Sequence, residues 1–401
     1  MDAVGNIRLL ESRKNSEGEK DFQRYSSRIE NYLACSKPSP ILVIDKEQVS
    51  KKFLHLRKQL SPIQIYYAVK ANPDTRLLKV LASLGSCFDV ASRPEIERCL
   101  ALGIAPERLS FGHTLKKRED IQFAFNNGID LFAFDCAAEL EKIASYAPRA
   151  RVFCRLQISH TEDAAWPLSQ KFGCTPQKAA ELLVYARTLE VNPIGLSFHV
   201  GSQMESTKAW DVALESAALV WRNVAKNGIE LSLLNLGGGF PGHYMRSFPT
   251  HDIYAQDLSK YISKHFSGID IPQIIIELGR AVVADSGVLE AEIVLVTPDS
   301  VLPDTRWVYL DVGLFNGLME ALGESICYRV LPVRKGISGG PCILAGPTCD
   351  SMDILYKKKS YILPKDLSCG DRLRFLSCGA YTSTYASVGF NGFEPLQVEV
   401  I

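Results

Sequence analysis

Short apolar stretches recur between residues 63 and 277, separated by longer stretches whose apolar residues have helical spacing. The first, 63–69, is aromatic and β-branched, which is typical of a buried strand. Helices are predicted between the strands, for example at 93–102 and 210–227. The predicted strands are 63–69, 87–90, 109–111, 131–134, 152–156, 194–198, 231–236 and 274–277. A doubly wound sheet fits this alternation, but eight strands favour a closed (β/α)8 TIM barrel.

The pattern changes after Ala281, where short β-rich runs alternate with turn residues and predict an antiparallel β domain. These runs are 288–296, 306–311, 327–333, 341–345, 372–377 and 396–401. A further short strand at 41–44 precedes a predicted amphipathic helix at 47–60. We therefore predict a polar, loosely ordered or partly helical arm at 1–37, a barrel domain at 45–282, and a β domain formed by 38–44 and 283–401.

Composition excludes several classes of protein. Lys and Arg number 45 and Asp and Glu also number 45, so no basic surplus indicates nucleic acid or an anionic membrane as a partner. No apolar run approaches the roughly 18 residues of a membrane span, and the N-terminus lacks the pattern of a signal peptide. The 11 cysteines have no CxxC pair or regular spacing, which favours free thiols in a reducing cytosol over disulfides or a metal site.

Polar or glycine residues end nearly every predicted barrel strand, where (β/α)8 enzymes gather their chemistry. These residues are Lys70, Asp89, His113, Asp135, Arg155, His199, Gly237 to Gly239, and Glu277. A lysine at the end of a buried strand is costly without a partner or a task. Desolvation lowers the pKa of an ammonium, and a neutral amine forms a Schiff base with an aldehyde. The alternative is that Lys70 only extends its ammonium to solvent.

The last two strands are followed by candidates for an anion site. Consecutive glycines at Gly238 and Gly239 let backbone N–H groups approach an anion, although turn formation alone explains most such runs. Arg280, after Gly279, is able to bind a phosphate bidentately, and Ser202 adds a hydroxyl donor. A phosphate and an aldehyde together indicate pyridoxal 5′-phosphate (PLP).

The remaining candidates each have a structural alternative. Glu277 facing the pyridine nitrogen keeps it protonated, which favours carbanion chemistry; an ion pair with Arg280 is the alternative. His199 is a candidate to stack on the ring, or a satisfied core histidine. Arg155 and Asp89 are predicted to pair, either to orient the site or only to stabilise the fold. In the β domain the candidates are Cys349 as proton donor, Asp350 as ammonium anchor and Tyr381 as a phosphate, ring or substrate contact.

Six motifs together resemble the fold-type III, alanine-racemase-like PLP decarboxylases over residues 38–401. They are YAVKANP at 67–73, FDVAS at 88–92, SFHVGS at 197–202, LGGGFP at 236–241, GPTCD at 346–350 and GAYT at 379–382. Within this family the chain resembles ornithine decarboxylases, and in particular the bacterial lysine/ornithine decarboxylases.

The resemblance implies a head-to-tail homodimer with two shared active sites and PLP bound covalently to Lys70. It implies that Cys349 of the partner subunit reprotonates the substrate carbon and that Asp350 of the partner subunit holds the distal ammonium. The cofactor would be surrounded by Asp89, Arg155, His199, Ser202, Gly238, Gly239, Glu277, Gly279, Arg280 and Tyr381.

The chain departs from the family pattern in three places. Leu278 replaces the proline of the usual Glu-Pro-Gly-Arg motif, which loosens the turn that sets Arg280. Ala321 occupies the slot of a second substrate-binding aspartate, so Glu320 is the candidate for that role, or the acceptor differs. The arm before Pro38 has no counterpart in the family.

The expected activity is decarboxylation of ornithine or lysine to putrescine or cadaverine. Arginine, diaminopimelate or a specialised amino acid are alternative substrates, although diaminopimelate decarboxylases carry Cys-Glu-Ser where this chain has Cys349-Asp350-Ser351. A catalytically inactive regulatory homologue is the alternative from another class.

Overall fold

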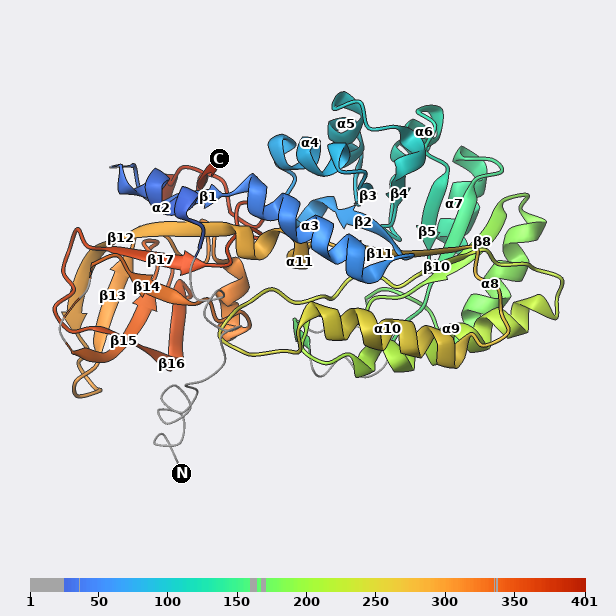
Figure 1. Ribbon diagram of the computed structural model, residues 1–401. Coiled ribbons are helices and arrows are strands. Elements are labelled where there is room, and N and C mark those ends of the chain that lie inside the picture. Colours follow the sequence, from blue (N-terminus) through green and yellow to red (C-terminus); the bar gives the residue numbers. More distant parts are fainter. Residues whose placement is uncertain (1–24, 36, 159–163, 167–170, 335, 337) are drawn as a thin grey trace.

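The computed structural model describes residues 25–401 except 36, 159–163, 167–170, 335 and 337, so most of the predicted arm lies outside the described residues. Figure 1 shows a barrel at one side and a β domain at the other, joined by continuous chain. The barrel is closed and parallel, in the order β10-β11-β2-β3-β4-β5-β6-β8. Its strands are β2 (Gln64–Ala68), β3 (Cys87–Val90), β4 (Leu109–Phe111), β5 (Leu131–Phe134), β6 (Arg151–Arg155), β8 (Asn192–Ser197), β10 (Leu233–Asn235) and β11 (Gln273–Leu278).

Each predicted barrel strand is present, and closure of the sheet excludes the doubly wound alternative. Side chains fill the barrel interior, among them Tyr66, Phe153, Leu233 and Ile275. The strands are buried on both faces because helices cover the outside, which explains their nearly continuous apolar runs. These helices are α3 (Lys46–Leu60), α4 (Thr75–Ser83), α5 (Arg93–Ala101), α6 (Arg118–Asn126), α7 (Ala137–Tyr146), α8 (Pro176–Thr188), α9 (Lys208–Ala225), α10 (His251–His265) and the short α11 (Arg280–Val283).

Helix α3 illustrates how the sequence sets an element. Asp45 caps it by accepting hydrogen bonds from the N–H groups of Glu47 and Gln48, which satisfies donors that have no partner within the helix. Its buried face, which includes Val49 and Phe53, packs against the neighbouring helices α4, α10 and α11. The remaining short elements are β7 (Ala164–Trp166), β9 (Ser202–Met204) and the 3-10 turns η2 (Val69–Ala71), η3 (Pro106–Arg108), η4 (Ala284–Ser286), η5 (Met319–Glu324) and η6 (Phe390–Gly392).

The β domain is mainly antiparallel, as predicted, but two of its strand pairs, β1–β18 and β13–β15, are parallel. Strand β16 was not predicted, because three consecutive lysines at 357–359 interrupt its apolar pattern. The strands of the β domain are β1 (Ile41–Ile44), β12 (Gly287–Pro298), β13 (Arg306–Leu310), β14 (Val330–Pro332), β15 (Gly339–Ala345), β16 (Ile354–Pro364), β17 (Arg372–Leu376) and β18 (Gln397–Val400). Because β1 pairs with β12, strand β1 belongs to the β domain, although the chain between these two strands forms the barrel. The domain boundaries stay a prediction.

The described part of the arm forms helix α2 (Ser27–Ala34), which lies beside the sheet of β1, β12 and β17 in Figure 1. Its Ile29 and Leu33 pack in one apolar cluster with Val43 and Leu376. Arg374 on β17 also contacts α2 through a salt bridge of 3.0 Å to Glu30. This segment is therefore a covering helix of the sheet, a role that its polar composition did not predict.

Candidate active site

Lys70 lies in η2, directly after strand β2, and its side chain is 41% exposed. Its Nζ donates a hydrogen bond of 3.0 Å to Oδ2 of Asp89, a buried residue on β3. Burial acts to lower the pKa of Lys70, but the negative charges of Asp89 and Glu277 outweigh burial and raise this pKa above its ordinary value. The predicted desolvation effect is therefore overcome, and the amine of this chain is held in its charged form.

Glu277, at the end of β11, accepts a hydrogen bond of 2.6 Å from Nδ2 of Asn235. Burial and the nearby carboxylate of Asp89 raise the pKa of Glu277 to about 7. Gly112 leaves room for this pair of acids, because a Cβ there would lie 2.0 Å from Oδ1 of Asp89 and 3.5 Å from Oε1 of Glu277. The alternative ion pair of Glu277 with Arg280 is absent from the described contacts.

Arg155, at the end of β6, lies over the ring of Phe172 at 5.4 Å. The predicted Arg155–Asp89 pair is wrong, because Asp89 pairs with Lys70. His199 follows β8, and its Nδ1 accepts a hydrogen bond of 3.0 Å from the N–H of Gly201. Burial and the charges of Arg155 and Lys70 hold the pKa of His199 well below 6.5. The imidazole is therefore neutral, which suits contact with an uncharged ring face.

The glycine loop after β10 lies close to the acid cluster. Gly237 has a φ of +63°, and a Cβ there would lie 1.8 Å from the carbonyl oxygen of Phe198, so only glycine fits. At Gly238 a Cβ would lie 2.8 Å from the carbonyl oxygen of Glu277 and 3.0 Å from Nε2 of His199. The glycine loop thus passes close to two predicted site residues, Glu277 and His199.

Arg280 begins α11 and is 4% exposed. Its Nη1 and Nη2 donate to the two carboxylate oxygens of Glu320, at 2.7 and 2.6 Å. Nη1 also donates to Oη of Tyr244 at 2.8 Å, and Nη2 donates to Oγ of Ser202 at 2.9 Å. Glu320 comes from η5 of the β domain, so this ion pair joins the two parts of the chain. Whether Glu320 also meets substrate stays a prediction.

The β domain approaches Lys70 through the segment around Tyr381. The N–H of Tyr381 donates to the carbonyl of Ala71 at 2.9 Å, and Nδ2 of Asn72 donates to the carbonyl of Gly379 at 2.8 Å. The Tyr381 ring has Arg280 above it at 4.8 Å. Tyr381 therefore lies beside the predicted phosphate site, next to the turn that carries Lys70.

Cys349 and Asp350 lie in a different environment, a turn of the β domain. Cys349 is exposed, and both its N–H and its Sγ contact Oδ1 of Asn391, at 3.0 and 3.4 Å. Asp350 accepts from the N–H of Met352 at 2.8 Å. Within one chain, no contact between described residues links this turn to Lys70.

The residues brought together fit PLP. The amine of Lys70 suits the aldehyde of PLP, and the neutral His199 suits the face of its ring. The acid with a raised pKa, Glu277, suits the pyridine nitrogen, and the glycine loop suits the phosphate. Two buried polar atoms, Oδ1 of Asp89 and Nε of Arg280, have no hydrogen-bond partner among the described residues. Buried polar atoms normally have partners, so a polar ligand at this cluster explains their arrangement.

Leu278, the departure from the proline of the family motif, is 1% exposed and lies opposite Tyr67 in the strand register. Its side chain is thus part of the core. Three residues at the site were not predicted: Asn235, Tyr244 and Phe172. The sequence contains a pattern that would have indicated Asn235, because this residue ends a strand just before the glycines. Tyr244 and Phe172 are aromatic residues in loops, and sequence alone does not distinguish such residues from packing residues.

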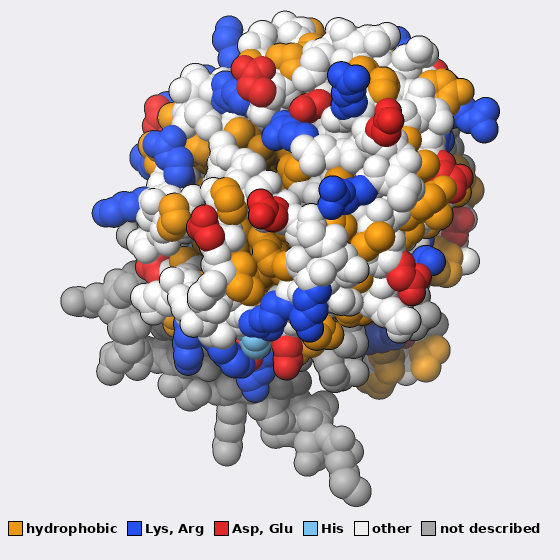
Figure 2. Space-filling model, turned by 90° about the vertical axis from the view of Figure 1, so that its right-hand side faces the viewer, with side chains coloured by type: hydrophobic (Ala, Val, Ile, Leu, Met, Phe, Trp, Pro, Cys, Tyr) orange, Lys and Arg blue, Asp and Glu red, His pale blue; other side chains and the backbone are white. Residues whose placement is uncertain are grey.

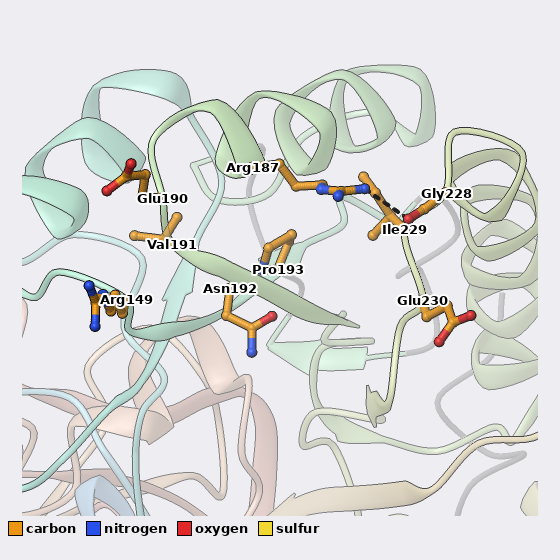
Figure 3. A pocket seen from close by; sticks show the side chains of 9 residues that line it. All are labelled: Arg149, Arg187, Glu190, Val191, Asn192, Pro193, Gly228, Ile229 and Glu230. Carbon is orange, nitrogen blue, oxygen red and sulfur yellow. Dashed lines mark hydrogen bonds between the residues drawn. The ribbon is translucent and has the colours of Figure 1, made fainter.

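A separate open hollow of about 380 Å³ is shown in Figure 3 and includes Arg187, Asn192 and Glu230 in its lining. It lies at the start of β8, whereas His199 follows the end of this six-residue strand, about 20 Å away. The side chain of Arg187 donates to the carbonyl of Gly228 at 2.8 Å across it. This amino-terminal end of a barrel contributes mainly to stability.

Surface and composition features add little to the site. On the face in Figure 2, basic and acidic side chains are interspersed. Among the described residues, no helix is long and apolar enough to cross a membrane. Nor do three or more His, Cys, Asp or Glu side chains of that part of the chain gather as a metal site.

Comparison with known proteins agrees with this chemistry. Residues 46–284 match the family model "Pyridoxal-dependent decarboxylase, pyridoxal binding domain". The lysine/ornithine decarboxylase of Selenomonas ruminantium is 30% identical over 93% of this chain and 92% of that protein. Antizyme inhibitor 2 of Xenopus laevis is 33% identical over 88% of this chain and 78% of that protein. The structure of the Paramecium bursaria Chlorella virus arginine decarboxylase bound to agmatine superposes with a TM-score of 0.85 at 28% identity, covering 94% of this chain and 100% of that chain.

Proposed function

Because this chain belongs to the family of pyridoxal-dependent decarboxylases, we propose that it decarboxylates ornithine or lysine, giving putrescine or cadaverine and CO2. The observation that carries the proposal is the Lys70–Asp89–Glu277 cluster, in which an accessible amine lies near the buried Asp89 and the half-buried Glu277, beside the glycine loop. Similarity to a lysine/ornithine decarboxylase over 93% of the chain supports this substrate class.

PLP supplies an electron sink that stabilises the charge left on the substrate carbon when CO2 departs. In the proposal Lys70 attaches the cofactor covalently, and Asp89 keeps the ammonium of Lys70 in place beforehand. Glu277, whose pKa is raised to about 7, would share a proton with the pyridine nitrogen of bound PLP. His199 is neutral and covers the ring face. The other proposed cofactor contacts are Arg155, Ser202, Gly238, Gly239, Gly279, Arg280 and Tyr381.

We propose further that the active enzyme is a homodimer in which the turn at Cys349 and Asp350 enters the site of the other subunit. The exposed thiol of Cys349 supports this, because a proton donor must reach the substrate carbon and the turn contacts no residue of its own chain's cluster. Cys349 then returns a proton to the carbon, and Asp350 binds the distal ammonium. Both oxygens of Glu320 are engaged by Arg280, so Asp350 is the carboxylate proposed for the ammonium.

Two alternatives remain within the same family. The first is arginine as the substrate, supported by likeness to an arginine decarboxylase. A regulatory protein without activity is the second, supported by likeness to antizyme inhibitor 2. Retention of Lys70 next to Asp89 favours an enzyme over the latter.

One experiment separates these possibilities. Purified protein is loaded with PLP and incubated separately with ornithine, lysine, arginine and diaminopimelate, and released CO2 and bound PLP are measured. We expect PLP bound at Lys70 and CO2 from ornithine or lysine. Bound PLP with CO2 only from arginine or diaminopimelate would contradict the substrate proposal, and no CO2 from any substrate would favour the regulatory alternative.

A further inference from the structure

Two cysteines outside the proposed site lie in contact with each other. Cys154 is on β6 and belongs to the same core cluster as Leu140 of α7 and Leu183 of α8, whereas its neighbour Phe153 belongs to the cluster inside the barrel. Cys174 lies just before α8 and is half-buried. The two Sγ atoms are 3.5 Å apart, although the residues are 20 positions apart in the chain. Both thiols are free, so a close thiol pair lies on the outer side of β6.

Backbone pairing with the end of β6 sets the position of Cys174. Its N–H donates to the carbonyl of Arg155 at 3.0 Å, and its carbonyl accepts from the N–H of Gln157 at 2.9 Å. These two bonds form a short parallel bridge opposite Leu156. Leu156 and Cys154 are two residues apart in one extended stretch and so point to the same side, which is why the two thiols meet.

The segment 172–174 also reaches the proposed cofactor site, through Phe172. The guanidinium of Arg155 lies over the Phe172 ring at 5.4 Å. Arg155 therefore contacts this segment twice, through its carbonyl at Cys174 and through its guanidinium at Phe172. A shift of the segment at Cys174 changes the surroundings of Arg155, which is one of the proposed cofactor contacts.

A disulfide between the two cysteines would require such a shift. The sulfur atoms of a disulfide are about 2.05 Å apart, so this pair has to approach by about 1.5 Å from its distance of 3.5 Å. Cys154 is fixed, because β6 is paired with β5 on one side and with β8 on the other. Cys174 lies outside the barrel sheet, so it is the residue that moves, and its backbone bonds to Arg155 and Gln157 lengthen.

We propose that Cys154 and Cys174 form a redox modification site: a peroxide converts the two thiols to a disulfide, which displaces the segment 172–174 from Arg155 and weakens the binding of PLP. Formation of the disulfide does not depend on the proposed function, whereas its effect on PLP rests on the proposed cofactor site.

The peroxide takes up the electrons that the two thiols lose. Cys174 reacts first, because it is the more exposed thiol and because burial raises the pKa of Cys154 well above 9.0. The Cys174 sulfur attacks one peroxide oxygen, the O–O bond breaks, and a sulfenic acid and one water form. The Cys154 sulfur then attacks the sulfenic sulfur, the S–O bond breaks, and the leaving hydroxide takes the proton of Cys154 as a second water. Dithiothreitol reverses the reaction by thiol–disulfide exchange.

The test measures cross-linking and cofactor affinity on the full-length protein prepared without PLP. The protein is treated with hydrogen peroxide, free thiols are blocked, and peptides are identified by mass spectrometry without reduction. We expect a peptide pair joined through Cys154 and Cys174. The dissociation constant of PLP is expected to rise about threefold to tenfold, the scale of one weakened contact to a charged group, and to return to its first value after dithiothreitol. Affinity is measured instead of activity because peroxide also reaches the exposed Cys349.

The proposal has two ways to fail in the wild-type protein. The absence of this peptide pair would overturn it, and so would a cross-link that leaves PLP affinity unchanged.

The variant Cys174→Ser separates the disulfide from other oxidation. It is expected to bind PLP as the wild type does, and peroxide is expected to leave that affinity unchanged. A loss equal to that of the wild type would overturn the proposal. Cys154→Ser provides the same comparison from the other thiol, and it serves if Cys174→Ser does not fold. Cys99→Ala is the matched control, because Cys99 is another buried cysteine of the barrel, on α5; it is expected to keep both the cross-link and the loss of affinity.

Failure of this inference and failure of the proposed function give different results. A protein that forms the cross-link and loses PLP affinity, but releases no CO2 from any substrate, would contradict the proposed function while leaving this inference intact. A reduced protein that binds no PLP would overturn both.

Discussion

Two lysines that follow barrel strands differ in exposure, in contacts and in the direction of their pKa shifts. Lys70, after β2, is partly exposed and contacts one buried acid, Asp89. Lys116, in the loop after β4, has a fully buried side chain that contacts Glu139 at 2.9 Å. The pKa of Lys70 is raised by the surrounding carboxylates despite burial, whereas burial lowers the pKa of Lys116 to about 8 although Glu139 opposes that change.

The difference teaches that a lowered lysine pKa does not by itself mark a reactive amine. Lys116 has the lower pKa, yet its Nζ also donates to the carbonyls of His113 and Ala133, at 2.8 and 2.7 Å. Two of its three donors are thus used by backbone carbonyls, and its charge is paired with Glu139. Lys70 is the better candidate because its side chain is accessible and lies beside Asp89, Glu277 and the glycine loop, the groups that fit PLP.

The largest effect is expected from Lys70→Ala. Loss of a covalent nucleophile commonly reduces kcat by about ten-thousandfold or more, so CO2 release from the preferred substrate falls at least that far. The variant also loses the absorbance of the PLP–lysine adduct. Lys116→Met is the control, since its folded fraction is expected to keep one PLP per chain. Loss of the adduct in Lys116→Met with retention in Lys70→Ala would reverse the assignment.

Lys116→Met probes the other side of the comparison. Removing one partner of a buried ion pair costs about 3–5 kcal/mol, because the remaining charge is left without compensation. Here that charge is Glu139, which is 3% exposed and keeps the partly exposed Lys142 as its remaining partner, so the lower end of this range is expected. The free energy of unfolding, measured by urea denaturation, is expected to fall by this amount. The double variant Lys116→Met/Glu139→Leu is expected to recover most of it, and failure to recover would mean that the two backbone hydrogen bonds of Lys116 matter more.

The barrel was predictable from sequence because its strands are buried on both faces and so read as apolar runs. Strand β16 was not, because Lys357 and its neighbours lie in the middle of it. The parallel pairing of β13 with β15 was also missed, since a strand's own pattern carries little information about the direction of its neighbour.

The sequence predicted those residues of the site that end or follow barrel strands. Lys70, Asp89 and Glu277 end or follow three consecutive barrel strands, and His199 follows β8, which only β10 separates from β11, so topology alone brings them to one end of the barrel. The Arg280–Glu320 pair was not, because it joins residues 40 positions apart in two different parts of the fold. Which carboxylate meets which cation depends on packing between those parts, and no local pattern encodes it.

The substitution Glu277→Gln tests whether the pKa of this acid near Lys70 is raised in the folded protein. The folded pKa of Glu277, about 7, lies above its ordinary value of 4.5, so its contribution to stability is complete below about pH 4.5 and is lost as the pH rises through about 7. Lys70 stays charged throughout this range and adds no slope.

Glutamine has no such titration. The stability of Glu277→Gln relative to the wild type, both without PLP, is therefore expected to increase by about 2–3 kcal/mol between pH 5 and pH 8. Urea denaturation at the two pH values provides the measurement. Parallel pH profiles for the two proteins would show that Glu277 is ionised normally and that Asp89 does not influence it.

The smallest effect is expected from Lys142→Met. Lys142 contacts the same carboxylate as Lys116, with Nζ 2.5 Å from Oε2 of Glu139, but its side chain is 21% exposed. Water is able to take over its role in part, and Glu139 keeps Lys116 as a partner, so a loss of about 1 kcal/mol is expected in urea denaturation. If Lys142→Met costs as much as Lys116→Met, then burial does not decide the strength of these contacts, and the contrast between the fully buried lysine and the accessible Lys70 has to be explained by the number of charges around each amine.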